Sequence, residues 1–234
     1  MEDYLIFIDT ETSGLPPQLN TPIDQVDKWP FIVQISWAIY KWDTELVKKE
    51  NCFIYDESIT IDKKAEQIHG ITMHELSSRG MRRKVVMLSL IKDLKKYNPL
   101  IVGHYIDFDL KMVEVALHRS ALRFSFKSLR KFCTMTATSE YSLMPNRNYP
   151  KLGELYLNLL GEKMALEHNA EFDVDATAKC FFKLLEKGEI SDDSIKRQIK
   201  LKDKSKSSKN ASGCGLNVLI LALLIAILFW IRPI

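Results

Sequence analysis

Three strand-like segments stand next to one another near the start of the chain, before any long helical pattern. They are YLIFID (4–9), FIVQISWAIYKW (31–42) and, after a short turn, ELVKKENCFIY (45–55). All three are rich in the β-branched and aromatic residues that are typical of strands. Neighbouring strands followed by alternating helices and strands predict an α/β domain with a mixed, five-stranded central sheet flanked by helices.

The alternation continues to residue 188. Apolar residues recur at helical spacing in four segments, 84–97, 107–119, 151–161 and 172–188. A short strand is expected at 100–103, and a fifth strand or extended edge within 132–141. The two last helices are each followed by a glycine, Gly161 and Gly188, in the position of a C-cap.

The segment ASGCGLNVLILALLIAILFWI (211–231) has no charged residue. About 20 apolar residues span the hydrocarbon core of a bilayer as a helix, and a core helix of a soluble domain would have a polar face. We therefore expect a transmembrane helix at 211–231 that serves as a single-pass C-terminal anchor. The chain then divides into a globular domain (1–190), a juxtamembrane linker (191–210) and the membrane helix.

The linker is basic, because KRQIKLKDKSKSSK (196–209) contains seven Lys/Arg and one Asp. Lys/Arg-rich flanks stay on the cytoplasmic side, so we expect the globular domain to face the cytoplasm. The net charge of +3 comes from this run, and the rest of the chain is slightly acidic. A nucleic-acid partner would therefore need a local cation, such as a bound metal ion, to offset the repulsion of its phosphates.

Two acidic residues, Asp9 and Glu11, lie two positions apart at the end of the first strand. Residues i and i+2 of a strand share a face, so both carboxylates can meet one ligand. A polar turn at the end of a strand would contain the same residues, and this stretch alone does not decide between the two interpretations.

Helical spacing separates two further pairs of aspartates. Three, four and seven residues after Asp109 the helix is apolar, whereas the same count from Asp107 reaches Leu110, Lys111 and Glu114. Asp109 is therefore predicted to lie on the buried face, and Asp107 near the helix N-cap.

The segment EHNAEFDVDATA (167–178) poses the same choice. By the same count Asp173 lies on the packed face of its helix and Asp175 on a half-solvated face. His168 precedes this helix by a loop, from which it can fold over the helix start. Glu167, Glu171 and Asp175 are interpreted as favourable charges near a helix N-terminus.

Four acidic side chains and one histidine thus form a candidate site. Oxygen ligands from several elements suit Mg²⁺ or Mn²⁺, whereas no His/Cys cluster has the spacing of a zinc site. Two such ions can hold the attacking and leaving oxygens of a phosphodiester, and a neutral histidine can take the proton of the attacking water. No nucleotide cofactor is expected.

At these residues the chain resembles the DEDDh 3′–5′ exonucleases, the DnaQ-like branch of the ribonuclease H-like fold, over residues 3–188. DTETSGL contains Asp9 and Glu11, GHYIDFDLKMV contains Asp109, and HNAEFD contains His168 and Asp173. The resemblance implies that His168 is the general base and that the four acids bind two Mg²⁺ or Mn²⁺ ions. It also implies release of nucleoside 5′-monophosphates from a 3′ end. Tyr105 departs from the family, which commonly has asparagine there.

The resemblance also suggests residues that bind the terminal nucleotide. IHGIT (68–72) is similar to the loop that lies beside the 3′-terminal nucleotide in the family, and the candidates are Thr12, Gly14, Leu15, His69 and Ile71. A helix C-cap at His69-Gly70 and plain packing of Leu15 are equally good interpretations. Gln34 and Cys133-Thr134 are interpreted as sheet positions without a chemical role.

The sequence thus predicts a membrane-anchored, metal-dependent 3′–5′ exonuclease. Its expected substrate is the 3′ end of a nucleic acid, single-stranded DNA in the first place and RNA as a second option. The alternatives are a non-catalytic nucleic-acid-binding membrane module that retains the fold, and a hydrolase of small phosphorylated molecules. The module would be expected to lack at least one of the five functional residues.

Overall fold

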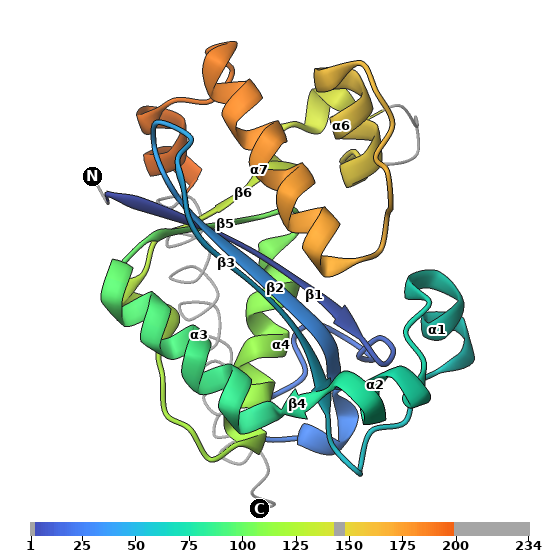
Figure 1. The fold of residues 1–234 in the computed structure, drawn as a ribbon. Helices are drawn as coiled ribbons and strands as arrows, with labels where there is room; N and C mark the ends of the chain where they lie inside the picture. The colour runs from blue at the N-terminus through green and yellow to red at the C-terminus, as the bar shows by residue number, and fades with distance from the viewer. Residues whose placement is uncertain (1–2, 143–147, 199–234) are drawn as a thin grey trace, which may run out of the picture. The chain divides into compact units, whose positions relative to one another are not determined.

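The computed structural model describes residues 3–142 and 148–198 (Figure 1). The chain divides into two compact units, Met1–Ser191 and Asp192–Ile234. Only a helical segment at 192–198 is described in the second unit. Within the described ranges, none of the helices has the length and apolar character needed to cross a membrane. The predicted membrane helix at 211–231 lies outside the described residues.

The first unit is built on a mixed sheet with the strand order β4-β3-β2-β1-β5-β6. Its strands are β1 (Tyr4–Thr12), β2 (Ile32–Lys41), β3 (Leu46–Tyr55), β4 (Met81–Arg82), β5 (Leu100–Gly103) and β6 (Lys131–Cys133). The pairs β1–β2 and β2–β3 are antiparallel, whereas β1–β5, β5–β6 and β3–β4 are parallel. The mixed sheet is confirmed, but it has six strands instead of five. The additional strand, β4, has only two residues, too few to show a period in the sequence.

The long helices cover both faces of the sheet (Figure 1). Helices α3 (Arg83–Tyr97) and α4 (Ile106–Arg119) pack on one face, and α7 (Ala170–Glu186), with α6 (Leu152–Leu160) beside it, packs on the other. The central strand β1 is therefore buried on both sides. Ile6 and Ile8 belong to the core under α3 and α4, whereas the ring of Phe7 contacts Phe181 of α7, with 5.6 Å between the centroids.

Two short helices, α1 (Lys63–His69) and α2 (Met73–Arg79), lie between β3 and β4. Helix α1 ends at the His69-Gly70 pair, as the C-cap interpretation expected, whereas α2 was not predicted. The sequence does contain a start signal for α2, since the hydroxyl of Thr72 accepts a hydrogen bond from the Glu75 backbone N–H at 3.1 Å. The segment 132–141 is extended only to Cys133, after which α5 (Thr134–Ala137) begins. Short 3-10 turns complete the described part, at Val26–Lys28, Phe126–Ser128 and Ser139–Tyr141.

Candidate active site

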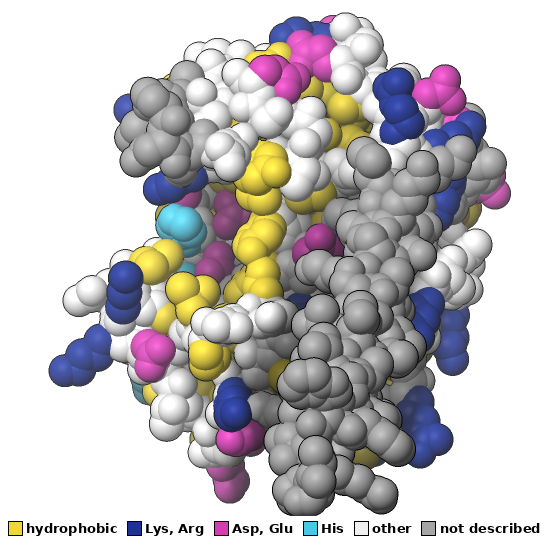
Figure 2. Space-filling view, turned by 180° about the vertical axis from the view of Figure 1, so that it is seen from behind, with side chains coloured by type: hydrophobic (Ala, Val, Ile, Leu, Met, Phe, Trp, Pro, Cys, Tyr) yellow, Lys and Arg dark blue, Asp and Glu magenta, His cyan; other side chains and the backbone are white. Residues whose placement is uncertain are grey.

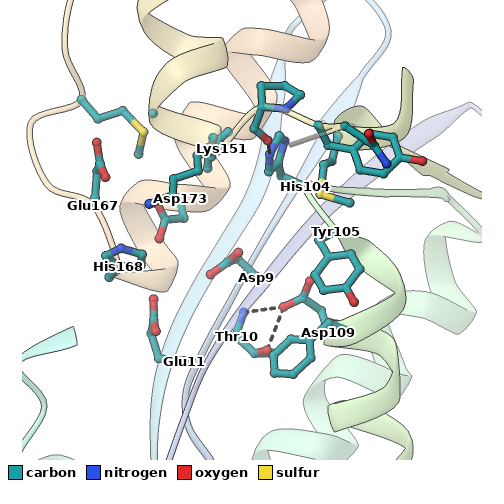
Figure 3. A pocket seen from close by; sticks show the side chains of 18 residues that line it. Asp9, Thr10, Glu11, His104, Tyr105, Asp109, Lys151, Glu167, His168 and Asp173 are labelled. Carbon is teal, nitrogen blue, oxygen red and sulfur yellow. Dashed lines mark hydrogen bonds between the residues drawn. The ribbon is translucent and has the colours of Figure 1, made fainter. Parts of the chain in front are cut away.

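Three carboxylates converge where β1 ends beside the start of α7. Asp9 and Glu11 project from β1 and Asp173 from the first turn of α7, and one ligand atom from each lies within 4.8 Å of the others. Figure 3 shows the three side chains directed toward a common space. Asp9 and Glu11 lie at alternate positions of β1, and Asp173 lies on the inward face of α7. The structure thus brings together three of the acids that the sequence predicted for the site.

Asp109 adds a fourth carboxylate from the first turn of α4, and it is buried as predicted. Its Oδ1 accepts hydrogen bonds from the Thr10 backbone N–H at 3.0 Å and from the Thr10 hydroxyl at 2.8 Å. Asp9, Glu11, Asp109 and Asp173 all line one cavity of about 570 Å³. Asp107 lies near the helix N-cap, as predicted, because α4 begins at Ile106. The cap is Tyr105, and Asp107 forms an ion pair of 2.8 Å with Lys131.

Burial and mutual repulsion hold protons on these acids. Burial, followed by the charges of Asp109, Asp173 and Glu11, raises the pKa of Asp9 well above its usual range. Burial, followed by the charges of Asp173 and Asp109, raises the pKa of Glu11 to about 8. Burial also raises the pKa values of Asp109 and Asp173 to about 7, although hydrogen bonds from Thr10 and from the Asn169 backbone act in the opposite direction. Such crowding favours a bound cation.

His168 lies in the loop before α7 and lines the same cavity. Its φ of 60° is in the left-handed region, which is uncommon for a residue other than glycine. Figure 3 shows its ring beside Glu11 and Asp173. Glu167 also lines the cavity, and its charge contributes to the raised pKa of Asp173. The sequence predicted Glu167 to be only a favourable charge near a helix start. In the structure it also belongs to the wall of the acidic cavity.

The other two acids of this segment lie away from the cavity. Asp175 and Glu171 form ion pairs with Lys49 of β3, at 2.7 Å and 3.1 Å. Asp173 and Asp175 therefore separate into a site residue and a surface residue, as the helical spacing predicted.

A second hollow, of about 370 Å³, lies on the other side of Glu11. Thr12, Gly14, Leu15 and His69 line it, whereas Ile71 does not. Ile71 is 3% exposed and packs in a hydrophobic cluster under α2. Both interpretations of the 69–70 pair apply, since Gly70 caps α1 with a φ of 72° while His69 lines the hollow. Leu15 is 79% exposed, so it is not packed in the core.

Comparison with known proteins decides the family. The exonuclease family model of the RNase T type matches residues 6–181, which include all the carboxylates described above. The chain belongs to this exonuclease family. No curated protein sequence matches the chain significantly.

Solved structures show that the fold of this exonuclease domain is shared. An Escherichia coli exonuclease I complex with single-stranded DNA superposes with a TM-score of 0.65 at 18% identity, over 79% of this chain and 41% of that chain. The nuclease domain of 3′hExo, described as a DEDDh family member bound to rAMP, gives 0.60 at 17% identity, over 81% and 96%. A full-length 3′-exonuclease gives 0.61 at 16%, over 80% and 83%. The chain thus spans about two fifths of exonuclease I.

The acids of the exonuclease domain fit a divalent metal. All the donors are hard carboxylate oxygens, and one oxygen each of Asp9, Glu11 and Asp173 already converge. Burial, followed by mutual repulsion, raises the pKa values of Asp9 and Glu11, and a cation would relieve that repulsion. Figure 2 shows acidic side chains set back from the surface beside a histidine and bordered by hydrophobic side chains.

Gln34 of β2 positions the start of α7, a role that the sequence did not indicate. This fully buried amide accepts a hydrogen bond from the Ala170 backbone N–H at 3.2 Å and donates to the side-chain oxygens of Asn51 and Asn169, at 2.9 Å and 3.3 Å. The Asn169 backbone N–H in turn donates to Asp173 at 3.1 Å. Gln34 therefore acts on Asp173 and His168 through the residues between them.

His104 secures the opposite wall of the cavity. Its ring lies 3.1 Å from the Thr134 hydroxyl and 3.1 Å from the Pro150 carbonyl oxygen. Burial lowers the pKa of His104 to about 4, so the ring is neutral at pH 7. A neutral ring protonated at Nε2 donates to Pro150, and its Nδ1 shares the hydroxyl proton of Thr134 with the Gly103 carbonyl oxygen, which lies 3.2 Å from that hydroxyl. Thr134, interpreted from the sequence as a plain sheet position, thus helps to hold the wall.

Proposed function

We propose that the chain is a divalent-metal-dependent 3′–5′ exonuclease that releases nucleoside 5′-monophosphates from nucleic-acid 3′ ends. The observation that carries the proposal is the convergence of Asp9, Glu11 and Asp173, with Asp109 beside them, in a chain of the exonuclease family. Four carboxylates without cations would repel the phosphates of a substrate. The arrangement of the carboxylates is therefore best explained by bound metal ions, which attract the phosphates of the substrate.

In this proposal the four acids hold two Mg²⁺ or Mn²⁺ ions. When bound, such ions would supply Lewis-acid stabilisation of the charge that develops on the phosphoryl oxygens. His168, at the mouth of the cavity, accepts a proton of the attacking water at a ring nitrogen. Thr10 holds the Asp109 carboxylate in place with two hydrogen bonds, and Gln34 holds the loop of His168.

The second hollow is assigned to the terminal nucleotide. The exposed side chains of Leu15 and Ile68 offer apolar contacts to a base, and Thr12 and His69 offer polar groups. Glu11 lines both this hollow and the acidic cavity, so a nucleotide in the hollow has a phosphate near the carboxylates. In this proposal it is the 5′ phosphate, the orientation that removal from a 3′ end requires.

Single-stranded ends are the proposed substrate. One similar structure contains single-stranded DNA, and another is described as recognising the 3′ end of a histone mRNA stem-loop. DNA and RNA are therefore both tested, because discrimination depends on contacts with the 2′-hydroxyl.

The experiment uses 5′-labelled single- and double-stranded DNA and RNA with Mg²⁺ or Mn²⁺. We expect the full-length chain to shorten single-stranded substrates stepwise from the 3′ end. Asp173→Asn should lower kcat by about 100-fold or more, a loss in the range of other electrostatic contributions to catalysis. Asp175→Asn, two residues away on the solvated face of α7, should retain activity. Equal activity of the two variants would contradict the assignment.

The alternatives make different predictions. A non-catalytic binding module would bind labelled oligonucleotides without shortening them under any metal condition. A hydrolase of small phosphorylated molecules would bind mononucleotides as tightly as oligonucleotides. At equal concentration, the two would then inhibit hydrolysis of a small phosphate ester equally. All five functional positions are occupied by the expected side chains, which favours the exonuclease.

We also propose that residues 211–231 anchor the enzyme in a membrane with the exonuclease domain on the cytoplasmic side. The support is the uncharged run of this segment and the basic run 196–209 before it. Such an anchor would restrict the enzyme to nucleic acid near a membrane surface.

A further inference from the structure

Tyr105 has a backbone conformation that its side chain disfavours. It precedes α4 with φ 76° and ψ 35°, in the left-handed region. Glycine and asparagine adopt this region at low cost, whereas a bulky residue there is an outlier. Strain of this kind is often found at functional sites, where it serves binding or catalysis.

The ring of Tyr105 is not needed to fill the core. The residue is 42% exposed and lines the acidic cavity. Its ring is stacked with that of Phe108, one turn along α4, at 6.2 Å between the centroids and only 9° between the planes. The two nearly parallel rings thus form an aromatic surface on the α4 side of the cavity. Figure 3 shows the Tyr105 ring beside Asp109, across the site from His168.

The Tyr105–Phe108 pair lies along the path that a bound nucleic-acid strand would follow. Phe108 lines both the acidic cavity and the second hollow, whereas Tyr105 lines only the cavity. With the terminal nucleotide in the second hollow and its phosphate at the carboxylates, the remaining strand continues into the cavity. The first base on the 5′ side of the scissile phosphate then reaches Tyr105.

The rest of the cavity wall suits such a strand. Tyr149 and Met135 add apolar surface, and Lys151 adds a cation. Aromatic rings combined with a positive charge are the usual means of binding single strands without sequence preference, because every base has a face that can stack.

We propose that Tyr105, aligned by Phe108, stacks on the base that precedes the scissile phosphate and thereby selects single-stranded ends of at least two nucleotides. This inference rests on the proposed function. A paired base cannot stack on a side chain without leaving its duplex, so the same contact disfavours double-stranded ends.

The test compares Tyr105→Asn, Tyr105→Phe and the wild-type full-length chain. Two substrates are used, a single-stranded oligonucleotide and a p-nitrophenyl ester of thymidine 5′-monophosphate, which has one base only. With Tyr105→Asn we expect the ratio of kcat/KM for the oligonucleotide to that for the ester to fall by about 5- to 100-fold, the range of a lost stacking contact. Tyr105→Phe should retain most of the wild-type ratio, because it keeps the ring.

A second readout separates substrate binding from a structural role. Asparagine suits the left-handed backbone, so Tyr105→Asn should melt at the wild-type temperature or above it. Thr44→Asn is the matched control, because Thr44 has nearly the same φ, 74°, in the turn between β2 and β3. We expect it to relieve strain without changing the substrate ratio.

Three results would overturn the inference. They are an unchanged ratio in Tyr105→Asn, an equal loss in Tyr105→Phe, and a fall in melting temperature that accounts for the lost activity. Each leaves the proposed function intact as long as the wild type shortens the oligonucleotide. A wild type that is inactive on both substrates would instead refute the proposed function.

Discussion

At the scale of single residues, the carboxylates of the site keep their protons over an unusual pH range. Glu11 has a pKa of about 8, and Asp109 and Asp173 have pKa values of about 7, mainly because they are buried. Each of these acids binds its proton more tightly in the folded chain than in the unfolded chain. The resulting stabilisation is complete below pH 4, and it is lost as the pH rises through 7 and 8.

We therefore expect the metal-free enzyme to lose stability between pH 5 and pH 8. One pKa unit corresponds to 1.36 kcal/mol, so a loss of about 2 kcal/mol or more in the free energy of unfolding is expected after allowance for solvent. Urea unfolding in EDTA at several pH values measures it. Because protons and metal ions compete for the same oxygens, stabilisation by Mg²⁺ should grow from pH 6 to pH 8.

The control for this pH dependence is again the pair of aspartates on α7. Asp173→Asn removes one repelling charge and should stabilise the metal-free enzyme at pH 8, whereas Asp175→Asn should retain the wild-type slope. A wild-type free energy of unfolding that does not change with pH in this range would contradict the raised pKa values of the site carboxylates.

At the scale of elements, the site depends on how α7 begins. Asn169 is the N-cap, and its side chain accepts a hydrogen bond from the Glu171 N–H at 3.2 Å. Gln34 of β2 binds both Asn169 and Ala170, so the strand that pairs with β1 also sets the start of α7. The register places Gln34 directly opposite Glu11. One strand pair thus aligns a carboxylate of β1 with the start of α7 and with the loop of His168.

Gln34→Leu should therefore impair the chemical step. The variant leaves the Ala170 N–H and the Asn169 side chain without this partner, which should cost about 1–3 kcal/mol of stability. As His168 and Asp173 shift, kcat should fall about tenfold, a loss of 1.4 kcal/mol. KM should change little, because Gln34 does not line the second hollow. Steady-state kinetics at saturating metal separate the two constants.

Gln25→Leu is the control for this substitution. Gln25 is exposed and accepts a hydrogen bond from Lys28 far from the cavity, so the variant should behave as wild type. If Gln34→Leu lost stability but kept its kcat, Gln34 would have a structural role only.

At the scale of the whole molecule, the sheet joins segments that are far apart in the sequence. The antiparallel pairs of β1, β2 and β3 form one half, and the parallel strands β5 and β6 extend it on the other side of β1. The site lies where β1 ends, between α4 and α7 on opposite faces. A central strand flanked by two helices can therefore bring acids from three elements to one cavity.

The proposed anchor is also a property of the whole molecule. Full-length chain expressed in cells should sediment with membranes and resist extraction by alkaline carbonate, whereas a chain that ends at residue 198 should be released. Both forms should shorten oligonucleotides, since the described domain contains all the site residues. Release of the full-length chain by carbonate would contradict a spanning helix.

The sequence by itself determined which side chains face inward. Asp109 and Asp173 follow from the spacing of apolar residues along a helix, and the two-residue period of a strand places Asp9 and Glu11 on one common face. The elements that carry them were predicted for the same reason. These periods are local, so they can be recognised without knowledge of the neighbours.

Only the tertiary structure decided how the inward-facing groups meet. Residues 9 and 173 become neighbours through the packing of α7 on β1, which no local period encodes. The role of Gln34, the burial of Ile71 and the two-residue strand β4 depend on contacts across the chain in the same way. A period specifies the face on which a side chain lies, whereas its partner is set by pairing and packing between distant segments.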